Sequence, residues 1–529
     1  MKLPSLKLPA DPAARATLAA AAATALVCFL VSWLGAAPAH LLGLHWDTGS
    51  FMAKMATTRH RWRFAGVPWT SHLALPQIYI VACAVTQLVG GSCFDAFRLL
   101  QSLCVAAGGL LFFATAARLA RSTTLGALLA VAFVTAWGIF ALVFSMVDNL
   151  VYLPPAMAVL YWCVRRVDDW RDRDSALVGA LAGAAALVSL QCVIYLIPPL
   201  FVVTFLGGSR GRRSVAVALL VRVRQLVVLV AAFAAVIVAW GLVLGATTNV
   251  SVRQVFGVMT DRPQATYVPR NEKELRALFD MKQFFHHLGM GVAQELTMGK
   301  SAEALYNRTR NLGVWLLAGE ALLFVGAVVA RWRKRAHTGL VFVAFTLLAF
   351  TCVTSLYHDL LIEKYKRYDF LPLLVFLSVA ALIGCAQRFH RPLARAAMIA
   401  AVAVIGLQTA GAVGNNRQWH AELPFFPRGL NEYYGRDGVS WIGYFRKLER
   451  AQPTACRFVF GIDEFSGIRW NHEVTAGLAT QLPAYAFVGW PNDVFKWKYK
   501  PPLLTPPATG ELRDCDVISP RARVQLHLP

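Results

Sequence analysis

Long apolar runs alternate with polar connections along most of the chain, and this pattern predicts its architecture. The runs hold about 16 to 22 residues, close to the length with which a helix crosses a hydrocarbon core of ~30 Å. The pattern therefore predicts an all-α polytopic membrane protein. Eleven runs are expected to span the membrane: residues 18–35, 98–117, 124–144, 150–164, 176–191, 193–207, 225–245, 312–330, 338–355, 369–386 and 394–413.

The connections differ in charge on the two sides of the predicted membrane. With the N-terminus inside, the connections on its side are short and rich in arginine, as the positive-inside rule requires. Together with the N-terminal segment they hold 21 basic and 5 acidic residues, a net charge of +16. They lie near residues 118–121, 165–174, 210–224, 331–335 and 388–395.

The opposite side carries the long polar segments. Channels and symporters usually keep short loops and place ionisable residues at mid-membrane, whereas long segments on one face are typical of an enzyme with its site at the membrane surface. Residues 1–413 are predicted to form a transmembrane catalytic module with outer loops 36–97, 246–311 and 356–368. Residues 414–529 are predicted to form a small extracytoplasmic α+β domain, because Arg457–Ile462 and Ala484–Val488 are strand-like pieces bounded by Gly and Pro.

Composition supports this picture and removes several classes of protein. The 529 residues are 57% hydrophobic and 15% charged, and the mean hydropathy is +0.51, which excludes an ordinary soluble enzyme. The net charge of +23 would suggest nucleic acid in a soluble protein, but most of it lies in the cytoplasmic connections, so no nucleic-acid partner is expected. The ten cysteines show no metal-ligand spacing, and the adjacent His286 and His287 are poor co-ligands for one metal, so no metal site is predicted.

Cysteine usage leaves one question open in the C-terminal segment. Cys456 and Cys515 are the only cysteines of residues 414–529. In an oxidising compartment they could pair across a long loop. Two unrelated buried thiols are the alternative.

Two further features need a place in this topology. Residues 72–90 are apolar enough to span, but a span here would move Arg118 and Arg121 outside, so we expect a juxtamembrane helix against the outer leaflet. Glu320 lies within a predicted span. An intramembrane carboxylate is a functional hypothesis by default, and a protonated carboxyl hydrogen-bonded to a neighbouring helix is the alternative.

The first outer segment contains the most suggestive single residue. Asp47 follows the first span by about ten residues, on a stretch whose Phe51, Met52 and Met55 would hold it at the interface. A carboxylate in such a half-dry place suits a general base for an acceptor hydroxyl. On the residues alone, the commoner role of Asp47 is the N-cap of a helix that continues through Thr48 and Ser50.

Several motifs, in their order and common sidedness, resemble those of the GT-C superfamily of integral-membrane glycosyltransferases. The motifs are Asp47 after the first span, a proline-bearing amphipathic stretch, the Gly90–Gly91 turn, Phe97–Leu100 (FRLL), Ser145–Asn149 (SMVDN) and Glu363–Pro372 (EKYKRYDFLP). Members that use polyprenyl-phosphate sugars include lipid A aminoarabinose transferases, protein O-mannosyltransferases and mycobacterial arabinosyltransferases. The similarity covers roughly residues 18–413.

The resemblance implies roles for individual residues. Asp47 would be the catalytic base, and Asp148 a second acidic residue that orients acceptor or donor sugar. Cations would neutralise the donor phosphate as it leaves. The residues implied in donor binding are Arg98, Glu363, Lys364, Arg367 and Tyr368, with Lys366 as a further candidate.

Each of these residues also has a simpler interpretation. Asp148 could cap a helix or form an Asp-Asn turn. Glu363 with Lys364 and Arg367 could be solvated interfacial charge, and Arg98 could snorkel to the interface.

The sequence also departs from the family pattern. Thr48 follows Asp47 where many relatives carry a second carboxylate, so a divalent cation has no support and no cofactor is required. Gln191-Cys192 stand where some relatives carry a basic residue.

The resemblance implies an inverting sugar transfer from a polyprenyl-phosphate-linked donor to the hydroxyl of a glycan or glycolipid acceptor. Because the Ala, Arg, Leu and Val bias is typical of GC-rich bacterial genomes, we expect a bacterial inner membrane with the site and the C-terminal domain in the periplasm, acting on cell-envelope glycans such as lipopolysaccharide. A transporter or flippase of lipid-linked saccharide, and a glycan polymerase or ligase, are the alternatives.

Overall fold

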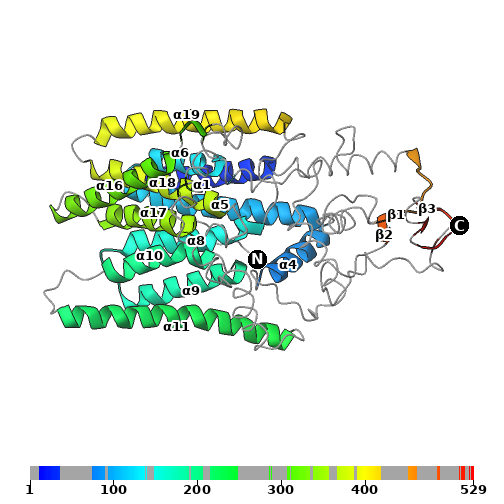
Figure 1. Ribbon diagram of the computed structural model, residues 1–529, viewed down its shortest axis with the longest axis horizontal. Helices are drawn as coiled ribbons and strands as arrows, with labels where there is room; N and C mark the ends of the chain where they lie inside the picture. The colour runs from blue at the N-terminus through cyan, green and yellow to red at the C-terminus, as the bar shows by residue number, and fades with distance from the viewer. Residues whose placement is uncertain are drawn as a thin grey trace.

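The computed structural model consists of a helical bundle and a small three-stranded sheet (Figure 1). It describes residues 11–35, 74–89, 93–136, 139, 148–189, 192–206, 215–247, 285, 288, 305, 307–309, 311–333, 338–356, 366–386, 390–418, 451–461, 485–488, 512, 514–518, 523–524 and 526–528.

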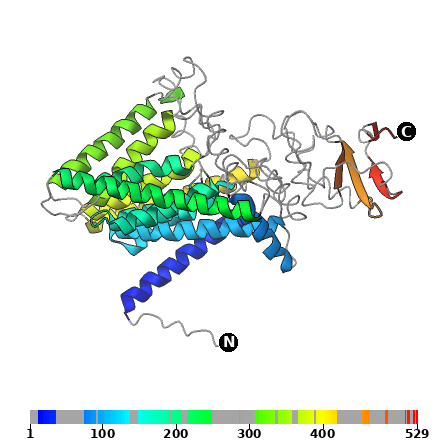
Figure 2. The same ribbon diagram turned by 90° about the horizontal axis from the view of Figure 1, so that it is seen from below.

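A helix lies at each of the eleven ranges predicted to span the membrane. Most of these helices run roughly along the longest axis of the molecule (Figures 1 and 2). Together with α4 and the short helix η1, which are not among the predicted spans, the described helices are as follows: α1 (Pro12–Gly35), α4 (Leu75–Leu88), α5 (Cys93–Ala120), α6 (Thr123–Thr135), η1 (Asp148–Tyr152), α8 (Leu153–Arg166), α9 (Asp172–Val188), α10 (Cys192–Leu206), α11 (Val215–Thr247), α16 (Leu312–Trp332), α17 (Thr338–Leu356), α18 (Lys366–Cys385) and α19 (His390–Gln418). Within the described ranges, five helices are long and apolar enough to cross a membrane: α1, α5, α11, α16 and α19.

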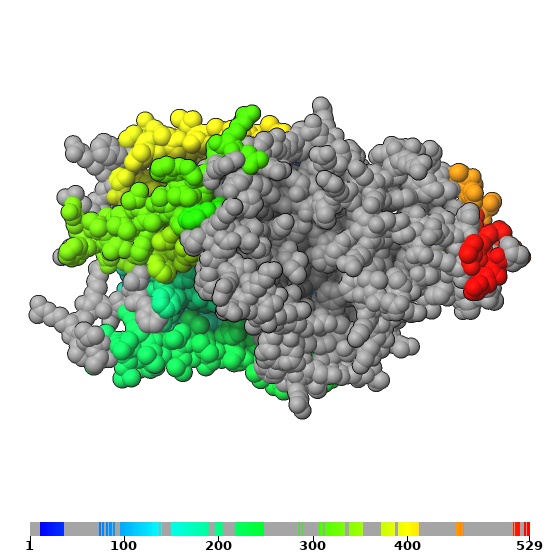
Figure 3. All heavy atoms as spheres, viewed as in Figure 1, coloured from blue at the N-terminus to red at the C-terminus, as the bar shows by residue number. Residues whose placement is uncertain are grey.

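The outermost helices expose apolar side chains, as lipid-facing helices do. Helices α19 and α11 form opposite edges of the bundle (Figure 3). On α16, Trp315 and Trp332 are 72% and 85% exposed, with Leu322 and Val325 exposed between them. The two tryptophans lie seventeen residues apart, or ~25 Å along a helix. Tryptophan is enriched at both membrane interfaces, so this spacing marks the apolar belt of the protein.

Helix α5 is the centre of the bundle. It packs against α1, α4, α6, α8, α18 and η1. Its Phe112 ring stacks on Phe133 of α6 with a centroid distance of 4.9 Å, and both side chains are fully buried. Helices from distant parts of the sequence therefore all pack on this one helix.

Helices α9 and α11 approach each other through small residues. A Cβ added to Gly179 would meet the backbone carbonyl of Leu229 in α11, and one added to Gly183 would lie 3.0 Å from the carbonyl oxygen of Phe233. Close backbone approach through glycine is a standard mode of helix association in membranes. The two helices can therefore pack this closely because Gly179 and Gly183 carry no side chain.

The connection between α8 and α9 is a network of paired charges. The fully buried carboxylate of Asp174 accepts hydrogen bonds from Trp162 Nε1 (3.0 Å), Arg166 Nε (3.3 Å) and the Arg171 backbone N–H (2.9 Å). The last of these caps the N-terminus of α9. A side-chain hydrogen bond from Arg171 holds the pKa of the exposed Asp169 below its usual range.

The same connection reaches three other helices. Thr338 of α17 donates to Asp168 at 2.5 Å, and Arg224 of α11 pairs with Asp172 at 2.8 Å. Arg331 of α16 lies 3.8 Å from Asp168. Four arginines that the sequence assigns to the cytoplasmic side, Arg166, Arg171, Arg224 and Arg331, thus pair with aspartates of this loop.

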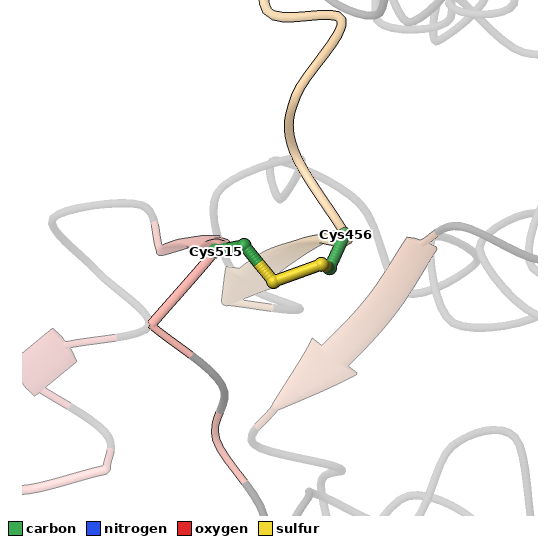
Figure 4. The surroundings of a disulfide bond; sticks show 2 residues. All are labelled: Cys456 and Cys515. Atoms are coloured by element: carbon green, nitrogen blue, oxygen red, sulfur yellow. A yellow bond between two sulfur atoms is a disulfide. The ribbon is translucent and has the colours of Figure 1, made fainter.

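The C-terminal strands form a parallel sheet with the order β2-β1-β3. Strands β1 (Arg457–Gly461) and β2 (Tyr485–Val488) coincide with the two strand-like pieces predicted from the sequence, and β3 spans Asp516–Ile518. Cys456 and Cys515 form a disulfide where β1 and β3 begin (Figure 4). The Cys456 backbone N–H donates to the Cys515 carbonyl at 3.0 Å.

We predict that Gly179→Ala destabilises the protein by about 1–3 kcal/mol, because the added methyl group forces α9 away from α11. The matched control is Gly319→Ala on α16, where an added Cβ meets nothing within 4 Å. Thermal unfolding of both variants in detergent measures the difference. Equal melting temperatures would contradict the close packing of α9 on α11.

We also predict that replacing both Cys456 and Cys515 by serine destabilises the C-terminal sheet by about 4 kcal/mol, from the loop of 59 residues that the disulfide closes. Limited proteolysis of the full chain should then cleave residues 451–528 faster and leave the bundle intact. The control is Cys385→Ser, which changes a cysteine of α18 that is not part of a disulfide. Unchanged cleavage would rule out a stabilising role for the disulfide.

Candidate functional site

The end of the bundle at which α1 finishes and α5 starts carries the features expected at the outer side. Helix α4 and the C-terminal sheet lie toward this end (Figures 1 and 2). Helices α16 and α18 begin there and α17 ends there, if the chain alternates direction as predicted. We therefore take this end as the position of the candidate site.

Arg98 binds the end of the first span. Its Nε and Nη2 atoms both donate to the Trp33 carbonyl, at 2.9 and 2.5 Å, and its guanidinium carbon lies 3.9 Å from the centroid of the Trp33 ring. Trp33 is among the last residues of α1, whose carbonyls lack partners within the helix. The helix dipole also favours a cation at this end. Hydrogen bonds of this charged type each contribute roughly 1.5–3 kcal/mol.

A second polar contact continues the same seam one turn deeper. Ser102 Oγ lies 3.2 Å from Ser32 Oγ, and both side chains are fully buried. Further in, Gly109 of α5 lies so close to Cys28 that an added Cβ would be 2.6 Å from its Sγ. Helices α1 and α5 are thus held together antiparallel over most of their outer half.

Asp148 begins the short helix η1, which leads into α8 and packs against α5, α8 and α9. Leu150, Val151 and Tyr152 are buried, and Leu153 fits against Gly108 of α5. The backbone of Asp148 therefore starts a segment anchored on the same helix as Arg98, although the Asp148 side chain lies outside the described part.

The other predicted site residues are only partly described. Residues Lys366, Arg367 and Tyr368 form the first turn of α18, with side chains outside the description. Asp47, Glu363 and Lys364 lie outside the described residues. The structure thus places Arg98 and the backbone of Asp148 on neighbouring elements, and it leaves the remaining predicted contacts untested.

The start of α4 lies against α9 and α11, and the helix packs mainly on α5. The Ala74 backbone N–H donates to the Leu187 carbonyl at 2.8 Å, and Ala74 packs with Ala186, Ile237 and Leu244. The 14 residues of α4 are fewer than the ~20 needed to cross a bilayer. Its exposed Val81, Val85 and Leu88 follow one face, which agrees with a helix lying at the membrane surface.

Glu320 is buried between α16 and α17, with 3% of its surface exposed. Its Oε1 accepts a hydrogen bond from Thr351 at 3.0 Å, while Oε2 has no hydrogen-bond partner among the described residues. A ring contact between Phe324 and Phe345 joins the same two helices at 5.2 Å. The geometry matches the alternative interpretation of Glu320, a carboxyl that links neighbouring helices.

The described residues contain no group of three His, Cys, Asp or Glu side chains arranged to hold a metal ion.

Some structurally important residues were not singled out by sequence reasoning. Ser32 and Ser102 are isolated hydroxyls in apolar spans, and their helix-linking role could have been suspected from that placement. Asp174 stands three residues after Arg171, at the capping position for a first helical turn. Trp33 had no signal, because its backbone carbonyl rather than its side-chain type attracts Arg98.

These observations define a class of protein: a polytopic membrane protein whose helices carry polar segments at one end. No family model matches the chain, and a search of curated proteins finds no match. Among solved structures, the chain is similar to the crystal structure of ArnT from Cupriavidus metallidurans bound to undecaprenyl phosphate. The match has 12% sequence identity and a TM-score of 0.54, and it covers 97% of this chain and 95% of that chain.

At this identity the similarity shows the fold alone. Nearly the whole chain shares the fold of that structure. The coverage extends beyond residues 18–413, on which the sequence resemblance rested.

We predict that Glu320→Gln leaves folding intact, because the amide oxygen can still accept the Thr351 hydrogen bond. Thr351→Val removes the donor and should destabilise the protein by about 0.6–1.7 kcal/mol, the range found for interhelical hydrogen bonds in membranes. Thermal unfolding compares the two variants. A Glu320→Gln protein that unfolds as wild type but loses turnover would instead give this carboxyl a catalytic role.

Proposed function

We propose that this protein is a membrane glycosyltransferase that moves a sugar from a polyprenyl-phosphate donor to an acceptor hydroxyl. The observation that carries the proposal is the similarity of nearly the whole chain to a structure bound to undecaprenyl phosphate. The sequence motifs support it independently, because they resemble those of membrane glycosyltransferases that use polyprenyl-phosphate sugars.

The proposed chemistry is a single displacement at the anomeric carbon. Asp47 accepts the proton of the acceptor hydroxyl, whose oxygen forms a bond to the anomeric carbon. The bond from that carbon to the phosphate oxygen breaks on the opposite face, so the configuration inverts. Polyprenyl phosphate leaves with the electron pair, and Asp148 orients the sugar or the acceptor.

Cations near the start of α18 are proposed to bind the leaving phosphate. Lys364, Arg367 and, as a further candidate, Lys366 lie close together in the sequence where α18 begins. Fixed positive charge lowers the barrier most where negative charge develops. Glu363 and Tyr368 of the same stretch are proposed to contact the donor sugar.

The proposed location of the site is the outer face of a bacterial inner membrane. The disulfide between Cys456 and Cys515 supports an oxidising compartment for the C-terminal sheet. The basic connections support a cytoplasmic position for the other end of the bundle. The acceptor would then be a glycan or glycolipid of the cell envelope.

We predict that Asp47→Asn lowers turnover by at least about 100-fold, the contribution typical of a general base, while donor binding is retained. The assay incubates the purified full chain with a panel of polyprenyl-phosphate sugars and measures released polyprenyl phosphate. The matched control is Asp169→Asn, an exposed aspartate of the α8–α9 connection, which should keep wild-type turnover.

Two results would overturn the proposal. Failure of the wild-type protein to release polyprenyl phosphate from any donor excludes glycosyl transfer. Transport of lipid-linked saccharide across vesicles that survives Asp47→Asn would identify a flippase, since transport needs no general base.

A further inference from the structure

We propose that Arg98 is a positioning residue that clamps the outer end of α1 to α5, and that it does not bind the donor phosphate. The inference rests on the proposed function, because α1 leads through residues 36–46 to the proposed base Asp47. It reassigns a residue that the family resemblance places among the phosphate ligands.

The N–H groups of Arg98 that would bind a phosphate already donate to a backbone carbonyl. Arginine binds a phosphate best through two parallel N–H groups on one edge of its planar fork. The Nε–Nη2 edge of Arg98 points at the Trp33 carbonyl, at 2.9 and 2.5 Å. The Trp33 ring covers one face of the fork at 3.9 Å.

The partner has its own need for this cation. The Trp33 carbonyl is one of the last in α1, and the last four carbonyls of a helix have no partner within the helix. Near a membrane interface an unsatisfied carbonyl is costly, and the negative end of the helix dipole favours a positive group. Arg98 supplies both a donor and a charge, and it comes from the best-anchored helix of the bundle.

The contact of Arg98 with Trp33 is one of three contacts along the interface between α1 and α5. Ser32 meets Ser102 one turn below the Arg98 contact, and Cys28 packs on Gly109 further in. These three contacts set the height and direction in which α1 ends. A catalytic base twelve residues beyond Gly35 depends on that direction, because a misplacement of about 1 Å can cost two orders of magnitude in rate.

The test separates a clamp from a ligand by replacing the clamp with a covalent bond. The Ser32→Cys/Ser102→Cys pair is placed in the full chain in nanodiscs, with Cys28→Ala and Cys104→Ala so that these two thiols of α1 and α5 cannot pair with the new ones. Oxidation with copper-phenanthroline then joins α1 to α5 independently of Arg98. Each variant is assayed for release of polyprenyl phosphate, reduced and oxidised.

We expect Arg98→Ala to lower kcat by about tenfold or more through misplacement of the base, with the donor KM changed by less than about twofold. Oxidation of the cysteine pair should restore kcat to within about threefold of the Arg98 protein. Arg98→Lys should behave like Arg98→Ala, because one ammonium group cannot bind the carbonyl and stack on the ring in the same way. Arg391→Ala, at an exposed position of α19, is the matched control and should be unaffected.

The opposite pattern would overturn the clamp. If Arg98 is a phosphate ligand, the donor KM rises in Arg98→Ala and is close to the wild-type value in Arg98→Lys. The cross-link then leaves the donor KM of Arg98→Ala unchanged. If Arg98→Ala cannot be purified, Arg98→Lys carries the same test, since the cross-link must restore its kcat as well.

Failure of the proposed function gives a different result from failure of the clamp. If the wild-type protein consumes no donor, the rate of disulfide formation between positions 32 and 102 is compared with and without Arg98. Slower and incomplete cross-linking without Arg98 supports the clamp on its own, and equal rates reject it.

Discussion

The structure depends on one constraint: a polar group inside a bilayer must find its partner within the protein. Helices satisfy their own backbone, which explains the form of the spans. The ends of helices and the few polar side chains within them cannot do so alone. Arg98 at Trp33, Thr351 at Glu320 and Ser102 at Ser32 are three solutions to the same problem. Each solution joins two helices, so the cost of burying a polar group is offset by a defined helix pair.

The two ends of the bundle meet this constraint differently. At the end assigned to the cytoplasm, arginines and aspartates of the α8–α9 connection pair with one another and with α11, α16 and α17. At the outer end, the described contacts run mainly through α5, which receives α1, α4 and η1. The described contacts at the cytoplasmic end are thus mainly ion pairs, while those at the outer end join other helices to α5.

Much of the fold follows from the sequence, because span length and apolarity are governed by the bilayer rather than by tertiary detail. Helices appear at every predicted run, and the strand-like pieces around Arg457 and Ala484 coincide with β1 and β2. The resemblance depended on the order and sidedness of short motifs, and the all-α bundle that it implied is present in the structure. The roles of single residues are harder to predict. Arg98 looks like a ligand in the sequence because nothing there reveals that a backbone carbonyl 65 residues earlier lies against it.

The parallel order of the C-terminal sheet has a consequence for how the chain is made. Strand β1 lies between β2 and β3, and its neighbour Cys456 is bonded to Cys515, 59 residues later. With this sheet outside the cytoplasm, as proposed, Cys456 emerges from the translocation channel well before its partner. The thiol must therefore wait, reduced or in a temporary mixed disulfide, until Cys515 and β3 have been exported. Completion of this sheet is thus coupled to the export of β3.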